Sequence, residues 1–395
     1  MRATCLWTAV GLLAVLSSGC GGRSSVSTPP PPASCTPASP PAFAYVLNDS
    51  GANTAVSMYT VDSCTGYLTP TTPSAVGAGA NAFGSEQMVV DSAGRFAYVA
   101  NLMSNAADEA TISMYTINSS TGVLTPTTPA TVPTGYFPQG IAIDPSGKFV
   151  YTANSDDNTV SMFTVDPGTG VLTPTTPAAV AAGWSPLSVT VDPSGKFAYA
   201  ANQDDGTVSM YTINSTTGIL TPMTPAAVPT GESPFGVTVD PSGKFAYVPN
   251  AYSVNNTVSQ YAVDSATGVL TPNTTSEVTA GNSPTSVAVD PSSKFAYVVN
   301  RMDDTVSMFT IDSSTGNLTP NTPATIATGG QPWRITIDPS GKFAYVTNQN
   351  SASVSIYTLN SDGTLTAAGT ASTGSDPVSL AVTGTSHPPV TMPGP

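Results

Sequence analysis

The stretch Phe343-Ala344-Tyr345-Val346-Thr347-Asn348 decides the fold, because close copies of it recur along the whole chain. Each copy is a run with the two-residue period of a β-strand that ends in an asparagine. Seven copies occur at a period of about 50 residues, a spacing typical of propellers, solenoids and repeat arrays. Their tyrosines are Tyr45, Tyr98, Tyr151, Tyr199, Tyr247, Tyr297 and Tyr345.

The third copy shows what one repeat contains. The segment Asp144-Pro145-Ser146-Gly147-Lys148 predicts a tight hairpin, because proline fixes φ and glycine accepts a positive φ. A second turn, Asp166-Pro167-Gly168-Thr169-Gly170, joins two further strands. Four antiparallel strands per repeat are what a propeller blade requires. In chain order we name them A, B, C and D, and in this copy we expect them at Ile141 to Asp144, Phe149 to Ala153, Thr159 to Asp166 and Val171 to Thr173.

The two ends of the repeat region indicate a closed ring. The first copy begins directly at strand B, with Phe43 to Leu47, and the last copy is followed by a surplus A strand, Val378 to Thr383. An open solenoid would need polar caps at its ends, and none is visible in the sequence. We therefore predict an all-β protein: a single seven-bladed β-propeller over residues 42–384, with the first blade closed by the C-terminal strand.

The charge of the chain argues against two classes of partner. Ten Lys and Arg residues oppose 24 Asp and Glu residues, which gives a formal net charge of −14. Nucleic-acid backbones and anionic membrane surfaces both attract clustered Lys and Arg. We therefore expect no nucleic acid as a partner and no membrane contact through the propeller surface. We also expect a monomer.

The first residues are typical of an export signal. Arg2 precedes an apolar run from Leu6 to Leu16 and then small residues, which predicts a signal peptide over residues 1–19. The run Leu16-Ser17-Ser18-Gly19-Cys20 resembles a bacterial lipobox, although Ser17 departs from the usual leucine. Lipidation of Cys20 would anchor the protein at the outer membrane or cell surface. Without that modification the protein would be periplasmic, secreted or held by a retained signal segment.

The segments that flank the repeats are rich in proline. Residues 20–41 predict an extended lipid-anchored linker, and residues 385–395 predict a disordered tail. Cys35 in this linker and Cys64 in the first repeat could form a disulfide in an oxidising compartment, or remain two free thiols. No cysteine spacing suggests a zinc site.

The stretch 343–348, followed by Ser353-Val354-Ser355-Ile356-Tyr357, resembles the YVTN repeat of seven-bladed propellers. The resemblance extends from Phe43 to Thr383. It implies a superfamily that includes surface-layer and cell-surface proteins and borders the lactonase propellers, which are similar to 6-phosphogluconolactonase and the muconate cycloisomerases. Because one fold serves many functions, the function has to be argued from a site.

Only one face of the predicted propeller varies between repeats. The A–B and C–D turns share a constant face, which carries Arg95, Lys148, Lys196, Lys244, Lys294 and Lys342. The B–C and D–A loops share the other face, which we call the loop face. An asymmetric ligand can bind a ring of similar units only where the symmetry breaks. The breaks include Tyr136 and Trp184 in D–A loops, and, where the A strands begin, Glu86, Gln87, Gln139, Phe235, Trp333 and Arg334.

Arg301 and Arg334 are the two basic residues of the repeats that lie off the constant face. Neighbouring blades would bring them to one side of the channel beside Trp333. Two guanidinium groups can hold a carboxylate or phosphate in bidentate geometry, and the indole can stack on a ring. In the alternative interpretation each arginine pairs with a nearby acid, such as Asp303 or Glu86. The predicted ligand site comprises Arg301, Trp333, Arg334, Glu86, Gln87, Gln139, Trp184, Phe235 and Tyr136.

Acidic pairs in three B–C loops raise the question of calcium. Asp156-Asp157, Asp204-Asp205 and Asp303-Asp304 offer carboxylate oxygens, but they lack the alternating ligand spacing of a dedicated calcium loop. Aspartate also forms Asx turns, which explain the pairs without a metal. We therefore predict no metal site and no cofactor, with Ca²⁺ as the less favoured alternative.

Few residues of the chain can do acid–base chemistry. The only histidine is His387 in the tail, so the propeller has no Ser-His-Asp arrangement. A carboxylate base such as Glu86, with Arg334 stabilising an oxyanion, could still hydrolyse a lactone. Two functions therefore compete. The first is a non-catalytic binding or structural module that uses the loop face to hold a glycan, peptide or protein, and the second is a lactonase acting on a sugar-acid lactone.

Overall fold

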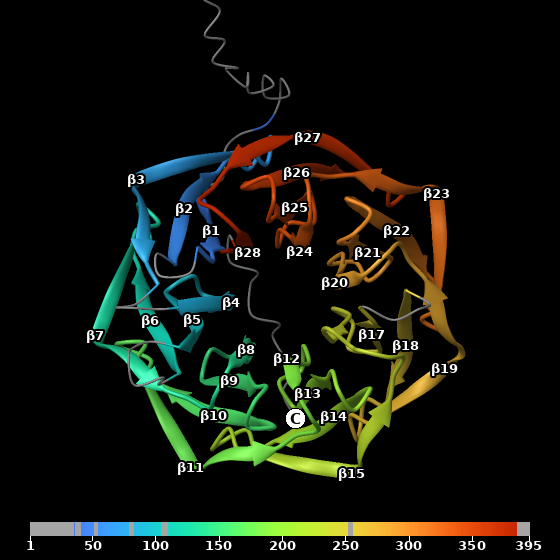
Figure 1. Ribbon diagram of the computed structural model, residues 1–395, viewed down its shortest axis with the longest axis horizontal. Helices are drawn as coiled ribbons and strands as arrows, with labels where there is room; N and C mark the ends of the chain where they lie inside the picture. The colour runs from blue at the N-terminus through green and yellow to red at the C-terminus, as the bar shows by residue number, and fades with distance from the viewer. Residues whose placement is uncertain are drawn as a thin grey trace, which may run out of the picture.

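The computed structural model describes residues 35, 41–50, 54–78, 83–103, 110–251 and 256–384, with residues 83–86 and 103 described by their backbone alone. These residues form seven four-stranded antiparallel sheets arranged as blades around a central channel (Figure 1). The predicted all-β, seven-bladed propeller is therefore confirmed. The predicted signal peptide, Cys20, most of the linker and the tail after Gly384 lie outside the described residues. Within the described ranges there is no helix with the length and hydropathy of a membrane span.

In each blade the strands follow one another from the innermost, A, to the outermost, D. Blade 1 contains β28 (Pro377–Val382), β1 (Ala42–Asn48), β2 (Ala55–Val61) and β3 (Leu68–Gly77). Blade 2 contains β4 (Phe83–Val90), β5 (Phe96–Met103), β6 (Thr111–Ile117) and β7 (Leu124–Pro133). Blade 3 contains β8 (Pro138–Ile143), β9 (Phe149–Asn154), β10 (Thr159–Val165) and β11 (Leu172–Ala181). Blade 4 contains β12 (Pro186–Val191), β13 (Phe197–Asn202), β14 (Thr207–Ile213) and β15 (Leu220–Pro229).

Blade 5 contains β16 (Thr238–Val239), β17 (Phe245–Pro249), β18 (Thr257–Val263) and β19 (Leu270–Thr279). Blade 6 contains β20 (Pro284–Val289), β21 (Phe295–Asn300), β22 (Thr305–Ile311) and β23 (Leu318–Ala327). Blade 7 contains β24 (Pro332–Ile337), β25 (Phe343–Asn348), β26 (Ser353–Leu359) and β27 (Leu365–Ser372).

The ring closes between the two ends of the repeat region. Strand β28 pairs antiparallel with β1, with Leu380 opposite Val46 and Ala381 opposite Tyr45. Val378 and Leu380 are buried. Blade 1 is therefore made of strands from both ends of the repeats, as predicted.

The outermost strands are longer than the sequence predicts. Strand D of the third repeat was expected at Val171 to Thr173, whereas β11 runs from Leu172 to Ala181 across Pro174 and Pro177. It remains paired with β10 through a register shift between Ser161 and Phe163. An outermost strand tolerates proline because one of its edges has no partner strand and needs no N–H donor.

Tyr45 shows how neighbouring blades are joined. Its hydroxyl donates to the carbonyl oxygen of Gly122, in the C–D turn of blade 2, at 2.9 Å. Gly122 has a φ of 71°, and a Cβ atom there would lie 2.2 Å from the ring of Phe43. Only glycine fits this contact. The corresponding tyrosines of blades 2, 3, 4, 5 and 7 make the same hydrogen bond.

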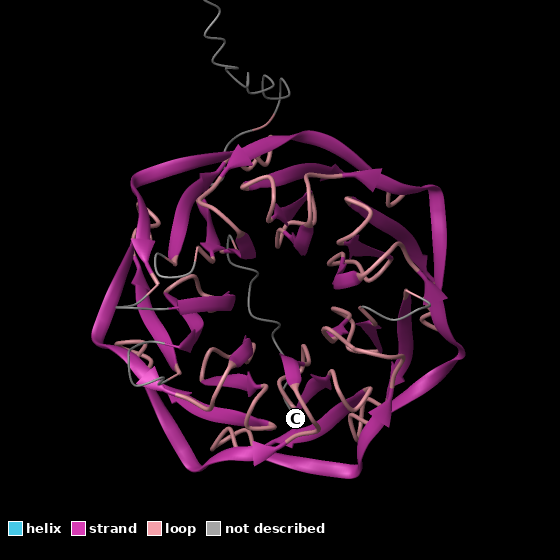
Figure 2. Cartoon of the chain, viewed as in Figure 1, coloured by secondary structure: helices cyan, strands magenta, loops and turns pink. Residues whose placement is uncertain are grey.

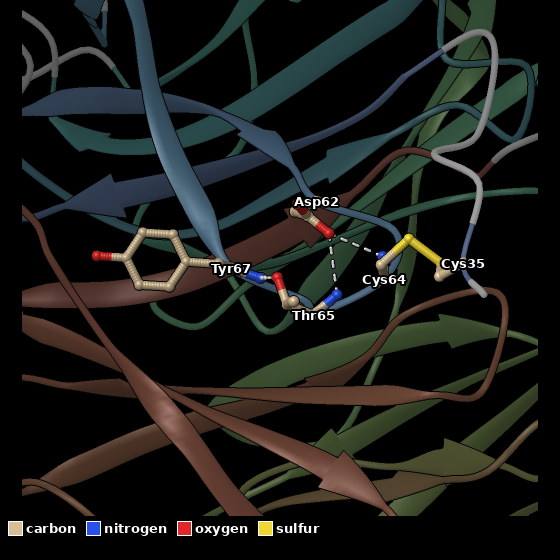
Figure 3. Close-up of a disulfide and its surroundings, with 5 residues drawn as sticks. All are labelled: Cys35, Asp62, Cys64, Thr65 and Tyr67. Atoms are coloured by element: carbon tan, nitrogen blue, oxygen red, sulfur yellow. Dashed lines mark hydrogen bonds between the residues drawn. A yellow bond between two sulfur atoms is a disulfide. The ribbon is translucent and has the colours of Figure 1, made fainter. Parts of the chain in front are cut away.

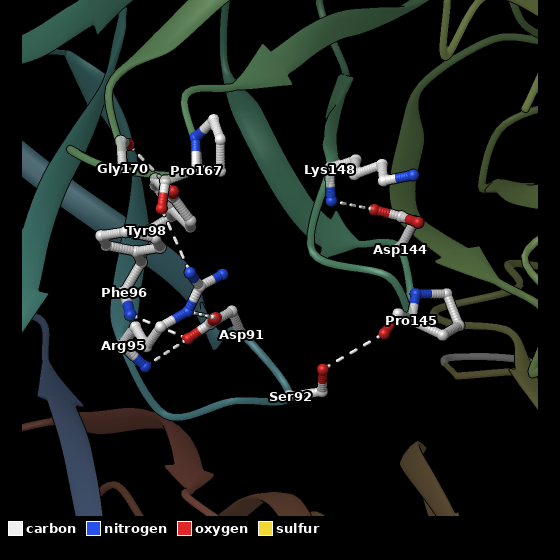
Figure 4. A network of polar contacts seen from close by, with 10 residues as sticks. All are labelled: Asp91, Ser92, Arg95, Phe96, Tyr98, Asp144, Pro145, Lys148, Pro167 and Gly170. Atoms are coloured by element: carbon white, nitrogen blue, oxygen red, sulfur yellow. Dashed lines mark hydrogen bonds and ion pairs between the residues drawn. The ribbon is translucent and has the colours of Figure 1, made fainter. Parts of the chain in front are cut away.

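The A–B turns of the constant face are held by buried carboxylates. Asp144 accepts hydrogen bonds from the backbone N–H groups of Lys148 and Phe149, both at 2.7 Å. Figure 4 shows the same turn in blade 2, where Arg95 Nε lies 3.2 Å from Asp91 Oδ2. Arg95 also donates to the carbonyl oxygen of Pro167 in blade 3 at 3.1 Å. The basic residue of this turn thus helps to join two blades.

A disulfide joins Cys35 to Cys64 (Figure 3). Cys64 lies in the C–D turn of blade 1, where the N–H groups of Cys64 and Thr65 donate to Asp62 Oδ1 at 2.8 and 2.9 Å. The bond ties the chain before β1 to the constant face of the propeller.

Candidate functional site

The innermost strands surround the central channel (Figure 2), and side chains leave a cavity of about 200 Å³ in its half nearest the loop face. Residues from blades 1, 2, 4, 5, 6 and 7 line this cavity. It is smaller than the roughly 300 Å³ at which sites for drug-sized ligands begin, so it suits a single small ring. Its wall is rich in hydroxyl groups, which belong to Ser188, Thr190, Thr238, Thr285, Ser286, Thr336 and Ser379.

Towards the constant face the channel becomes less polar. A second cavity of about 350 Å³ shares Gln87 and Thr190 with the first, and its further lining includes Val90, Ile143 and Val382. Polar ligand groups are therefore better accommodated in the half nearest the loop face, which we call the channel cavity.

Arg334 is the one charged side chain among the described residues that line the channel cavity. It lies on β24 and is half-buried. Its backbone N–H donates to the Thr347 hydroxyl at 3.2 Å, and β24 and β25 are irregularly paired at this point. A threonine hydroxyl thus takes the place of a backbone ladder partner at the residue that carries the guanidinium. A cation among hydroxyl groups can hold a carboxylate, a phosphate or a developing oxyanion.

Trp333 is only 8% exposed and is not among the residues that line the channel cavity, so its ring offers no open stacking surface. Its indole packs edge-to-face against Phe235 of blade 5, with centroids 5.3 Å apart. The guanidinium of Arg301 lies 4.4 Å from the indole centroid, and Arg301 Nη2 lies 3.3 Å from Gln349 Oε1. Arg301, Trp333 and Phe235 therefore form one packed group, whereas the neighbouring Arg334 lines the cavity.

On the innermost strands of blades 2 and 3, one of the predicted site residues with a described side chain lines the channel cavity. Gln87 lines the channel cavity, and its Oε1 accepts a hydrogen bond from the N–H of Ile141 at 3.2 Å. Gln139 lies on β8, half-buried and outside the residues that line the cavity. The backbone of Glu86 belongs to β4, directly before Gln87, and its side chain lies outside the described atoms.

Tyr136 and Trp184 lie away from the cavity, at equivalent positions of adjacent D–A loops. They are 58% and 67% exposed. Their backbone N–H groups donate to Asp157 Oδ2 at 2.8 Å and Asp205 Oδ2 at 2.7 Å. In this structure the acidic B–C pairs thus supply acceptors that hold the aromatic loops. Among the described residues no three His, Cys, Asp or Glu side chains group closely enough to hold a metal ion.

One feature of the cavity escapes prediction from the repeat pattern. Pro249, on β17, is the only described lining residue that comes from a B strand. The other blades have Leu47, Ala100, Ala153, Ala201, Val299 and Thr347 at this position. A proline within a strand that is paired on both sides is a rare feature, and it could have marked blade 5 as irregular.

Comparison with known proteins places these observations in a family. The family described as "Lactonase, 7-bladed beta-propeller" matches the chain over residues 18–184, 56–232 and 238–382. A search of curated proteins finds no match.

Solved structures share the fold at low sequence identity. A protein from Bacteroides fragilis described as a "putative 6-phosphogluconolactonase" aligns with a TM-score of 0.71 and 21% identity, over 87% of this chain and 98% of its own. The corresponding protein of Bacteroides uniformis has the same TM-score and identity, over 87% and 99%. The periplasmic gluconolactonase of Pseudomonas aeruginosa aligns with a TM-score of 0.69 and 19% identity, over 87% and 99%. At these identities the likeness establishes the propeller fold alone.

Proposed function

Because the chain belongs to the family of seven-bladed β-propeller lactonases, we propose that it binds and hydrolyses a small sugar-acid lactone in the channel cavity. The observation that carries this proposal is Arg334, a cation that lines a cavity the size of one small ring, among hydroxyl groups. A sugar-acid lactone matches that wall, since it has one polarised carbonyl group and several hydroxyl groups. Structural neighbours that are described as lactonases, a gluconolactonase among them, favour the same substrate class.

The proposed chemistry is ester hydrolysis within the ring. A water oxygen adds to the lactone carbonyl carbon, and the Arg334 guanidinium stabilises the negative charge on the carbonyl oxygen. The ring C–O bond then breaks, and the proton from water passes to the departing ring oxygen, giving an open-chain hydroxy acid. As the base we propose Glu86, because it is an acidic residue on the innermost strand of blade 2 and a carboxylate can accept the proton of water. The step needs no cofactor.

Hydrolysis of D-glucono-δ-lactone by purified variants tests this proposal. Arg334→Ala should lower kcat/KM by about 10²- to 10³-fold, the usual effect of removing an oxyanion donor. Arg95→Ala is the matched control, because Arg95 lies on the constant face, and its rate should equal that of the wild type. A wild-type rate no greater than that of buffer, or equal rates for wild type and Arg334→Ala, contradicts the proposal.

A second candidate function rests on the exposed aromatic residues of the loop face. Tyr136 and Trp184 present large exposed rings on loops that hydrogen bonds hold in place. Such a pair suits stacking on the sugar rings of a glycan, while peptides and proteins remain further partners to test. Affinity electrophoresis in gels containing neutral polysaccharide should show retardation that Trp184→Ala abolishes. Equal mobility of the two proteins in every gel contradicts this candidate.

We also propose that the protein is exported and anchored by a lipid on Cys20. The Cys35–Cys64 disulfide supports export, because such bonds persist in oxidising compartments. Cells that express the wild type should incorporate labelled palmitate into the protein and retain it in the membrane fraction. Cys20→Ala should lose both, and a soluble, unlabelled wild-type protein contradicts the anchor.

A further inference from the structure

The innermost strand of blade 5 is interrupted beside the channel cavity. Strand β16 pairs with β17 at only two positions, Thr238 with Tyr247 and Val239 with Ala246. In blade 6 the ladder continues further, through Val287 with Val298 and Ser286 with Val299. Pro249 stands where Val299 stands in blade 6 and has no N–H to donate, so the ladder is interrupted at this point. Pairing resumes at Pro234 with Asn250, and the Phe235 N–H donates to the Pro249 carbonyl oxygen at 2.9 Å. The cavity consequently reaches past the A strand to Pro249 itself.

Gly236 leaves the same place without a side chain. The corresponding residues of blades 4, 6 and 1 are Ser188, Ser286 and Ser379. A Cβ atom at Gly236 would meet a single neighbour, Ser188 Oγ, at 4.0 Å. By contrast, a Cβ atom at Gly140 in blade 3 would lie 2.7 Å from the Ser188 Cα atom. Glycine at 140 is therefore required by packing, whereas glycine at 236 borders open space.

The missing side chain also removes a hydrogen-bond acceptor. In other blades the residue at this position accepts from the inner strand of the next blade: Ser379 Oγ from Met88 N–H at 3.2 Å, and Ser286 Oγ from Ile335 N–H at 3.4 Å. In blade 6 the corresponding donor is the N–H of Val287. The residue at the acceptor position in blade 5 is Gly236, which has no side chain to accept. The two strands are neighbours at this point, because Thr238 Oγ1 donates to the carbonyl oxygen of Val287 at 2.9 Å.

We propose that Gly236, Pro249 and the Val287 N–H form a subsite that takes one hydroxyl-bearing arm of the ligand whose carbonyl or carboxylate group lies at Arg334. The ligand oxygen accepts from Val287 N–H, in place of the serine hydroxyl of other blades. The ligand hydroxyl group donates its proton to the carbonyl oxygen of Gly236. Pro249, the residue opposite Gly236 on β17, has no N–H that could donate to this oxygen. This inference rests on the proposed function. It adds that a hydroxyl-bearing arm of the ligand is recognised at blades 5 and 6.

Gly236→Ser tests the subsite, because it restores the residue that three other blades carry and fills the space. We expect an unchanged melting temperature and a loss of kcat/KM for D-glucono-δ-lactone of about tenfold or more. Gly77→Ser is the matched control, since a Cβ atom at Gly77 meets nothing within 4 Å and β3 lies at the outer edge of blade 1. Pro249→Val restores the ladder donor and should lower the rate in the same way.

The outcomes separate this inference from the proposed function. If the wild type hydrolyses the lactone and Gly236→Ser does so equally well, the subsite is wrong and the lactonase proposal stands. If the wild type does not hydrolyse the lactone, the lactonase proposal fails, and calorimetric titration with gluconate decides the subsite. Binding by the wild type that Gly236→Ser abolishes supports the subsite. Equal binding by both proteins, or no binding by the wild type, overturns it.

Discussion

Replacing tyrosine by phenylalanine should have different effects on stability at two equivalent positions of adjacent blades. Tyr247 and Tyr297 are both completely buried. The Tyr247 hydroxyl donates to the Gly316 carbonyl oxygen at 2.9 Å. The Tyr297 hydroxyl has no hydrogen-bond partner among the described residues. The carbonyl oxygen that would serve it, on Gly363, accepts from Asn321 Nδ2 at 3.1 Å instead.

The expected free-energy changes follow from these contacts. Tyr247→Phe removes a hydrogen bond and leaves the Gly316 carbonyl oxygen buried without its donor, which costs about 1–3 kcal/mol of unfolding free energy. Tyr297→Phe removes a buried hydroxyl that gains nothing from the protein. Its unfolding free energy should therefore stay within about 0.5 kcal/mol of the wild type or rise. The two variants should therefore differ by about 0.5 kcal/mol or more, with Tyr247→Phe the less stable.

Chemical denaturation followed by tryptophan fluorescence and circular dichroism measures both changes under one set of conditions. Tyr345→Phe extends the comparison, because its hydroxyl donates to the Gly66 carbonyl oxygen at 2.9 Å. It should lose stability as Tyr247→Phe does. Equal losses for Tyr247→Phe and Tyr297→Phe would refute the reasoning, because the hydrogen bond between blades would then contribute nothing.

Other substitutions and conditions test separate parts of the structure. Gly122→Ala should lower the unfolding free energy by about 1–3 kcal/mol, because it strains a φ of 71° and meets the Phe43 ring, whereas Gly77→Ala should leave thermal melts unchanged. Burial raises the pKa of Tyr115 to about 12, above the ordinary value near 10. The folded state thus favours the protonated phenol, so its contribution to stability is complete below pH 10 and is lost as pH rises towards 12. Tyrosinate absorbance of the buried residues should therefore appear together with loss of circular dichroism, and full ionisation of an intact fold would contradict this. Cys35 and Cys64 should resist alkylation until a reductant is added, and labelling of either of these two cysteines in the unreduced protein, located by peptide mass spectrometry, would exclude the disulfide.

The blade count and the closure were predictable from the sequence because both depend on local repetition. Strand B with its terminal asparagine recurs seven times, and the surplus strand at the C-terminus matches the A strand that the first copy lacks. The ends of the D strands were not predictable, because Pro174 and Pro177 look like strand terminators locally. They are compatible with a strand only because β11 has a free outer edge, which is a property of the whole sheet.

The site was predictable in part, for the same reason. Placing Arg334 at the channel follows from counting along strand A, and the structure lines the cavity with it. The packing of Trp333 against Phe235 joins blades 5 and 7, so no local pattern reveals it. Arg301 was predicted either to share a ligand with Arg334 beside Trp333 or to pair with a nearby acid, and its guanidinium lies over the indole of Trp333. The opening beside Pro249 results from a missing ladder hydrogen bond between β16 and β17. In the sequence the only sign of it is one unusual proline.

A crystal structure of the wild-type protein soaked with gluconate tests most directly whether the channel cavity is the ligand site. We predict density for one molecule in the channel cavity, with its carboxylate at Arg334 and one hydroxyl group between Gly236 and the Val287 N–H. An empty cavity at saturating gluconate, or density only beside Trp184 on the loop face, would contradict this placement.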